Sequence, residues 1–307
     1  MPVFHVRKSE FIAAPVAKVY ESVLDFRRWA AWSPWLIAEP GARMSYAEDG
    51  RSYTWDGEVT GSGMMEITGG DPPWSIVYRL TFLKPWKSVN QVEFHFSEHD
   101  GGTEVLWTME GKLPFFMFWL KGMMSAWIGS DYRRGLLMLK DLVETGAVPS
   151  KLEFLPHQAA GGFRYTGVRS QCPTEGIGPS MQADMQKLMA WVGSSGTQPK
   201  GKPFSITHKW DPVKGVADYT LGIPVEEFAA GLPEGFVSGD IPVCEAYVVQ
   251  HTGAYRHLGN AWASGVMHGR AKKYRTDRHV EAFEIYENDP TVTPEAELVT
   301  RVHFPSK

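Results

Sequence analysis

The chain has 307 residues, a formal net charge of −4 and a hydrophobic content of 43%. This length accommodates two compact domains, and so much hydrophobic residue excludes a mainly disordered chain. Neither half carries the excess of lysine and arginine that nucleic-acid binding normally requires, and nine of the 12 tryptophans precede residue 150.

The first half has the pattern of one antiparallel sheet followed by one long helix. Residues 3–12 alternate as in a strand, and a helix begins after Pro15. Between residues 43 and 109 the apolar positions recur with a period of two, which predicts a meander whose last hairpin turn is at 99–102. An apolar stripe between Trp127 and Val143 predicts a long helix that ends near Gly146.

The opening sequence P-V-A-K-V-Y-E-S-V-L-D-F-R-R-W-A-A-W-S-P-W and the pattern of the closing helix resemble the START-like (SRPBCC) superfamily, most closely its polyketide cyclase/dehydrase branch. The resemblance covers residues 1–147. It implies a helix-grip fold with an apolar cavity between helix and sheet, which would explain the many tryptophans. The aromatic run at 113–124 is equally consistent with a cavity lid and with a core segment, and its candidate residues are Phe115, Phe116, Phe118 and Trp119. Trp127, on the predicted helix, is a further candidate for the cavity or lid.

The second half contains an internal repeat. Each copy has a strand, a helix, a strand that begins Phe-x-Ile and ends Asp-Pro, and a strand that ends in an apolar residue and proline. The copies span residues 162–225 and 246–305. We infer two β-α-β-β units related by a pseudo-two-fold axis, with a cleft at their interface. The whole chain is therefore expected to be of the α+β class.

Three segments make residues 152–307 similar to a GyrI-like small-molecule-binding domain, the effector-binding domain of multidrug-sensing activators. They are H-T-G-A-Y at 251–255, A-F-E-I-Y-E-N-D-P at 282–290 and V-H-F-P at 302–305. The resemblance implies that Glu284 sits in an aromatic-lined pocket and contacts cationic or polar ligands. Such sensors usually carry a helix-turn-helix module, whose place the START-like half takes here, so we expect no direct nucleic-acid binding.

Strand alternation sends Phe283 and Ile285 to one face and Glu284 and Tyr286 to the other. If the apolar pair faces the helices, Glu284 faces the cleft, where desolvation raises its pKa and each aromatic ring adds about 0.5–2 kcal/mol of attraction for a cation. The alternative is an ordinary solvated strand glutamate. Further candidate ligand contacts, each also a candidate core residue, are Tyr255 and Trp262 from the second copy and Tyr165 and Trp210 from the first.

Other motif searches give negative expectations. The histidines at 251, 257, 268, 279 and 303 have no metal-site spacing, so we expect them at the surface or at helix ends, and we expect no metal and no cofactor. The N-terminus lacks a signal-peptide pattern, which leads us to expect a cytoplasmic protein. The longest apolar run, 113–120, is shorter than the roughly 20 residues that span a bilayer.

Three functions remain open from the sequence. The first is a small-molecule-binding protein that senses or detoxifies, with an aromatic, cationic or lipophilic ligand. The second is a hydrolase in which Glu284 acts as a base and Tyr255 or Tyr286 polarises the leaving oxygen; the resemblance implies it, because some GyrI-like proteins hydrolyse cyclopropane-containing toxins. The third is an inhibitor-type interaction protein. Neither the ligand nor the oligomeric state follows from the sequence.

Overall fold

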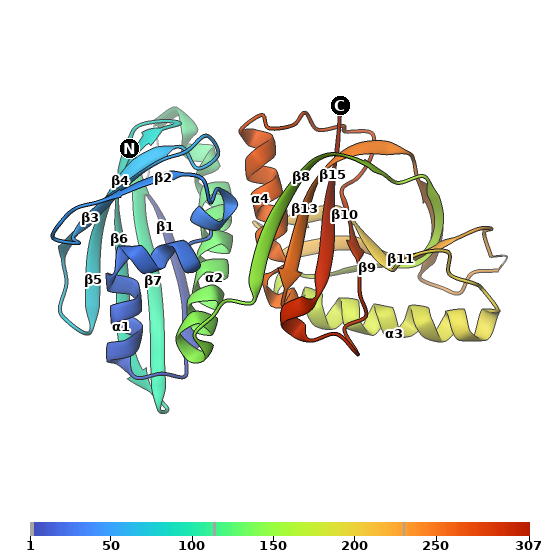
Figure 1. Ribbon diagram of the computed structural model, residues 1–307, viewed down its shortest axis with the longest axis horizontal. Coiled ribbons are helices and arrows are strands. Elements are labelled where there is room, and N and C mark those ends of the chain that lie inside the picture. The colour runs from blue at the N-terminus through green and yellow to red at the C-terminus, as the bar shows by residue number, and fades with distance from the viewer. Residues whose placement is uncertain (1–2, 113–114, 230) are drawn as a thin grey trace. The chain divides into compact units, whose positions relative to one another are not determined.

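The computed structural model describes residues 3–112, 115–229 and 231–307 (Figure 1). Its contacts divide the chain into an N-terminal unit, Met1–Val148, and a C-terminal unit, Pro149–Lys307. In the described part of the chain, no helix is long and apolar enough to cross a membrane.

The N-terminal unit is a seven-stranded antiparallel sheet with a long helix packed on it (Figure 1). The strand order is β1-β7-β6-β5-β4-β3-β2. The strands are β1 (Val3–Ile12), β2 (Arg43–Tyr46), β3 (Ser52–Asp56), β4 (Ser62–Gly69), β5 (Ser75–Lys84), β6 (Ser88–His99) and β7 (Gly102–Lys112). The helices are α1 (Val16–Leu24) and α2 (Lys121–Thr145), with 3-10 turns at Phe26–Ala31, Leu36–Ala38 and Phe115–Leu120.

Local sequence explains where these elements end. The β6–β7 turn places Asp100 and Gly101 at φ values of 42° and 81°, a left-handed backbone that Asp and Gly adopt at low cost. Helix α2 ends at Gly146, whose φ is 86° and whose N–H donates to the Leu142 carbonyl at 3.0 Å. The predicted helix-grip arrangement is confirmed.

The core of the N-terminal unit is a cluster of aromatic rings in mutual contact. The ring of Trp107 stacks on Tyr132 and on Phe94, with centroids 3.8 Å and 4.7 Å apart. Trp29 and Trp32 meet the same indole edge-on at 6.2 Å and 5.7 Å. All five side chains are fully buried. Three of the nine tryptophans of the first half therefore belong to this cluster, whereas Trp74, Trp86, Trp119 and Trp127 are exposed.

The C-terminal unit is an eight-stranded antiparallel sheet in the order β12-β9-β11-β10-β14-β15-β13-β8. The strands are β8 (Ser150–Ala160), β9 (Phe163–Pro173), β10 (Phe204–Asp211), β11 (Val216–Val225), β12 (Phe236–Ile241), β13 (Cys244–Gly253), β14 (Phe283–Tyr286) and β15 (Val299–Ser306). The helices are α3 (Ile177–Ser195) and α4 (Gly259–Arg270), with 3-10 turns at Thr174–Gly176, Tyr255–His257 and Glu295–Glu297.

The duplicated β-α-β-β organisation is confirmed. The first copy is β9-α3-β10-β11 and the second is β13-α4-β14-β15. Within the sheet the copies meet where β10 pairs with β14, and there Ser205 lies directly opposite Glu284. Each is the middle residue of its Phe-x-Ile triplet, so the repeat places a serine and a carboxylate at equivalent positions on either side of the pseudo-two-fold axis.

Candidate functional site

The two faces of β14 have different surroundings. Phe283 packs with Phe204 and Tyr165 in a cluster formed by other strands. Glu284 instead contacts Trp262 of α4. The carboxylate therefore faces the helices, and the apolar residues of β14 face away from them, which reverses the orientation considered from the sequence.

The Glu284 carboxyl group is buried and held at both oxygens. Glu284 is only 5% exposed to solvent. The indole Nε1 of Trp262 donates to Oε2 at 2.5 Å, and the Tyr286 hydroxyl donates to Oε1 at 2.6 Å. Burial raises the pKa of Glu284, and the two hydrogen bonds offset part of this rise. Without a bound ligand, the carboxyl group of Glu284 therefore keeps its proton to a higher pH than a solvent-exposed glutamate does.

Tyrosines extend the site around the carboxyl group. The rings of Tyr255 and Tyr286 meet edge to face, with centroids 5.9 Å apart. Burial, together with the nearby charge of Glu284, raises the pKa of Tyr255 to about 12 and raises the pKa of Tyr286 well above its usual value. Both hydroxyls stay protonated near neutral pH. With Trp262 they form a half-buried aromatic rim around Glu284.

Not all the predicted ligand residues reach this rim. Tyr165 lies on the opposite face of the sheet, with its ring 5.3 Å from that of Phe204. Trp210 lies near the end of β10, beyond an irregularity in the β10–β11 register, and is 47% exposed. The structure brings together the residues of the second copy, Glu284, Tyr286, Tyr255 and Trp262, and the first copy contributes Ser205, which is a hydrogen-bond partner of Tyr286.

A buried polar row continues from the rim and was not predicted. Tyr286 pairs across the sheet with Thr300, which pairs with His251. His251 is fully buried, and its Nε2 lies 3.1 Å from the Ser150 hydroxyl, which accepts a hydrogen bond from Asn260 at 3.1 Å. The expectation of surface or helix-end histidines is wrong for His251 and His303, which are buried within β13 and β15; His257 is also buried, but it ends the 3-10 turn Tyr255–His257.

Burial lowers the pKa of His251 to about 4, with a smaller contribution from His257. An unfolded histidine titrates near 6.5, so acid protonates the unfolded state first. The stability that neutral His251 contributes is present above pH 6.5 and is lost as the pH falls toward 4, by about 3 kcal/mol in total. We expect His251→Asn to remove this part of the acid sensitivity.

The measurement is urea unfolding of wild type and variant at pH 7 and pH 4.5. The difference in the free energy of unfolding between wild type and His251→Asn should be smaller at pH 4.5 than at pH 7. His279→Asn is the matched control, because His279 is exposed. An unchanged difference between wild type and His251→Asn at both pH values would contradict the assignment.

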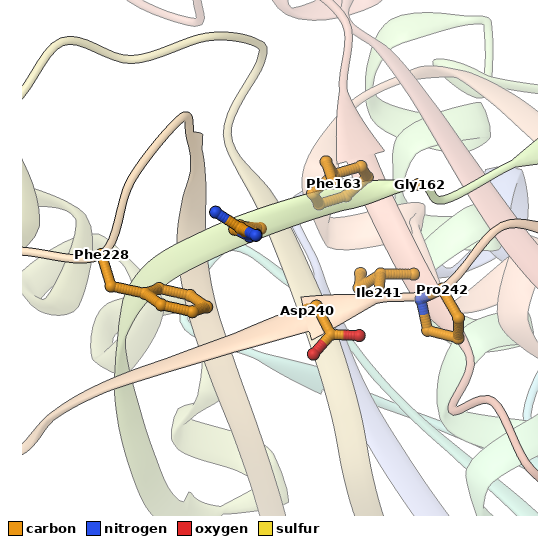
Figure 2. A pocket seen from close by; sticks show the side chains of 7 residues that line it. Gly162, Phe163, Phe228, Asp240, Ile241 and Pro242 are labelled. Atoms are coloured by element: carbon orange, nitrogen blue, oxygen red, sulfur yellow. The ribbon is translucent and has the colours of Figure 1, made fainter.

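A shallow depression of about 440 Å³ lies elsewhere on the C-terminal unit, beside the outer strand β12 (Figure 2). The guanidinium of Arg164 lies over the Phe228 ring at 5.5 Å, and Asp240 is the cross-strand neighbour of Arg164. The figure shows Phe228 and Asp240 on different sides of this depression. Its lining includes none of the residues around Glu284, so the two are separate features.

The candidate lid of the N-terminal unit is largely on the surface. Phe118, Trp119 and Trp127 are 61%, 69% and 37% exposed. Phe115 and Phe116 belong to the 3-10 turn that precedes α2, but their side chains lie outside the described part of the structure. The described lid side chains therefore face solvent at the start of α2.

Comparisons with known proteins agree with this division of the chain. Residues 3–144 match the family model described as polyketide cyclase / dehydrase and lipid transport, and residues 160–307 match the GyrI-like small molecule binding domain. No curated protein sequence matches the chain significantly.

Solved structures similar to this chain include a START superfamily protein from Mycobacterium smegmatis, with 16% identity, a TM-score of 0.34 and coverage of 47% of this chain and 99% of that one. Protein Ms6760 from Mycobacterium smegmatis gives 20% identity, a TM-score of 0.33 and coverage of 46% and 90%. EcmrR in its DNA complex has 16% identity and a TM-score of 0.42, with coverage of 61% of this chain and 65% of that one.

Proposed function

The chain joins a START-like domain of the polyketide cyclase/dehydrase type to a GyrI-like small-molecule-binding domain, and we propose that the second domain binds aromatic or lipophilic cations at Glu284. The observation that carries this proposal is the buried carboxyl group inside a rim of one tryptophan and two tyrosines. Detection or removal of such compounds would be the biological use of the site.

Charge balance supports a cation as the ligand. The interactions that act on Glu284 are burial and two hydrogen bonds from neutral groups; within the described residues no lysine or arginine pairs with it. An ionised carboxylate that is buried without a positive partner is costly. A bound cation supplies that partner, and the faces of Trp262, Tyr255 and Tyr286 are suited to adding cation–π attraction.

Cation binding at this site should release a proton. Because burial raises the pKa of Glu284, the carboxyl group must lose its proton before it can pair with a cation. As the pH increases toward that pKa, the affinity for tetraphenylphosphonium should rise by up to about tenfold per pH unit. Above that pKa the affinity should be constant. Titration calorimetry at a fixed pH, in buffers with different ionisation enthalpies, measures the protons released.

Triphenylphosphine oxide is a suitable neutral control, because its binding requires no ionised partner. Its affinity should not rise with pH, and its binding should release no proton. Cation binding with no proton release at any pH and with a pH-independent affinity would contradict the proposal.

Hydrolysis is the second candidate function, and the raised pKa of Glu284 favours it. Such a carboxylate can take a proton from water while the water oxygen bonds to an electrophilic carbon, and the bond between that carbon and the leaving atom breaks with its electron pair going to the leaving atom. A protonated Tyr255 or Tyr286 can then give a proton to the leaving atom. Glu284→Gln separates the two functions. If the site only binds, the variant loses cation affinity and there is no turnover to lose. If the site hydrolyses its ligand, the variant also loses turnover by about 10²–10⁴-fold.

A further inference from the structure

One end of the N-terminal unit exposes several large apolar side chains. The tip of the β5–β6 hairpin exposes Leu83 (52%), Trp86 (51%) and Val89 (60%) to solvent. The turn before α2 exposes Phe118 and Trp119 even more. Scattered apolar residues are normal on a surface, but a group that includes two exposed tryptophans is a mark of an interaction site.

Strand register places both segments at the same end of the sheet. Gln91 of β6 pairs with Glu110 of β7, so the start of β6 runs beside the end of β7. A Cβ atom at Gly111 would lie 2.8 Å from the Asn90 amide oxygen, which confirms that the two strand ends are close. The hairpin tip and the segment that follows β7 therefore project from one end of the unit.

The charged residues of the two exposed segments have one sign, although the acidic Glu58 and Glu110 also lie at this end of the sheet. The charged residues of segments 83–89 and 118–121 are Lys84, Lys87 and Lys121, and Lys112 ends the adjacent strand; all four are exposed. The chain as a whole has a net charge of −4. The two segments thus combine exposed lysines with exposed tryptophans.

We propose that this end of the N-terminal unit, residues 83–89 and 118–121 with Lys112, docks on the surface of an anionic lipid bilayer. Tryptophan rings partition to the interface between water and hydrocarbon because they have an apolar body and a polar N–H group. Lysines beside them attract anionic headgroups, with an effect of about fivefold in affinity for each lysine near the surface.

A bilayer fits this end better than a protein groove does. The exposed side chains lie on a hairpin tip and on the turn that precedes a helix, which can enter the headgroup layer while the sheet stays in water. The two segments together supply both apolar side chains and cationic groups, and shallow peripheral binding generally needs both. The inference does not depend on the function of Glu284, which lies in the other unit.

The test is co-sedimentation of the full chain with vesicles of phosphatidylcholine, with and without 30% phosphatidylglycerol. We expect binding to the anionic vesicles only, at least a tenfold loss of affinity for Lys84→Glu/Lys87→Glu, and a similar loss for Trp86→Ser/Trp119→Ser. Trp74→Ser is the matched control, because Trp74 is 43% exposed and precedes β5 at the other end of the sheet. All the changed residues are exposed, so the variants should fold.

Two kinds of result would overturn the inference. One is the absence of binding to anionic vesicles, or equal binding by Trp86→Ser/Trp119→Ser and Trp74→Ser. The other is concentration-dependent self-association in light scattering that Trp86→Ser/Trp119→Ser abolishes, since a second copy of the chain would then cover this end.

Discussion

Glu284→Gln is expected to lower the affinity for tetraphenylphosphonium about 100-fold at pH 8, which corresponds to about 2.7 kcal/mol. The substitution removes the negative charge and keeps the size and planarity of the side chain. The amide oxygen can accept from either Trp262 or Tyr286, so one of the two donors loses its partner. A loss of this size is usual when one member of a buried charge pair is removed.

The same variant should not unfold the C-terminal unit at pH 8. Because the folded-state pKa of Glu284 is raised, its contribution to stability is full below the unfolded pKa and is lost as the pH rises through the folded pKa. Glutamine does not titrate, so the stability of the variant relative to wild type should increase with pH. Thermal unfolding at pH 4.5 and pH 8 measures this change.

Glu153→Gln is the matched control for binding. Glu153 lies on β8, is exposed and accepts a hydrogen bond from Gln250 at 3.3 Å. Its amide variant should bind the cation as wild type does. If Glu284→Gln binds within threefold of wild type at pH 8, the carboxylate is not the cation partner and the proposed function fails.

The sequence identified Glu284 and Tyr286 as neighbours on one face because alternation in a strand depends only on the chain itself. It could not assign that face to the helices. Which face of β14 lies against the helices depends on the face on which Phe204 and Tyr165 pack. These two residues belong to strands far away in the sequence. The same uncertainty placed Tyr165 in the site, although it packs on the opposite face.

The contact between Trp262 and Glu284 depends on a feature that sequence reasoning did not detect. A Cβ atom at Gly265 would lie 2.0 Å from the Phe304 ring, so glycine allows α4 to approach β15 closely. That approach brings the Trp262 indole within 2.5 Å of the carboxyl group. Helix α4 contains three glycines, and the sequence does not reveal which of them packs against a strand, or against which strand.

His251 shows a different limit. Its sequence neighbours show no metal-site spacing, and that absence led to the prediction of a position at the surface or at a helix end. Its position two residues after the buried Val249, in the same strand, is the signal that could have placed it inside. Strand periodicity thus carried more information about this residue than its chemical type did.

Trp107→Ala is expected to lower the free energy of unfolding of the N-terminal unit by about 3–5 kcal/mol. The indole is fully buried and contacts Tyr132 and Phe94 by stacking. Removal of a large ring from such a cluster leaves a void that the neighbouring rings cannot fill without leaving their own contacts. Tryptophan fluorescence during urea unfolding measures the change, because nine of the 12 tryptophans lie in this unit.

This variant also decides between the two meanings of the tryptophan excess. If the rings are a packed core, the loss of Trp107 destabilises the unit, and Trp74→Ala, at a position that is 43% exposed, changes its stability by less than about 0.5 kcal/mol. If Trp107 instead borders a cavity that a lipophilic ligand normally fills, truncation enlarges a space that already exists. The cost without ligand would then be near 1 kcal/mol or less, because few packing contacts would be lost. The mutual stacking of the buried rings leads us to expect the first result.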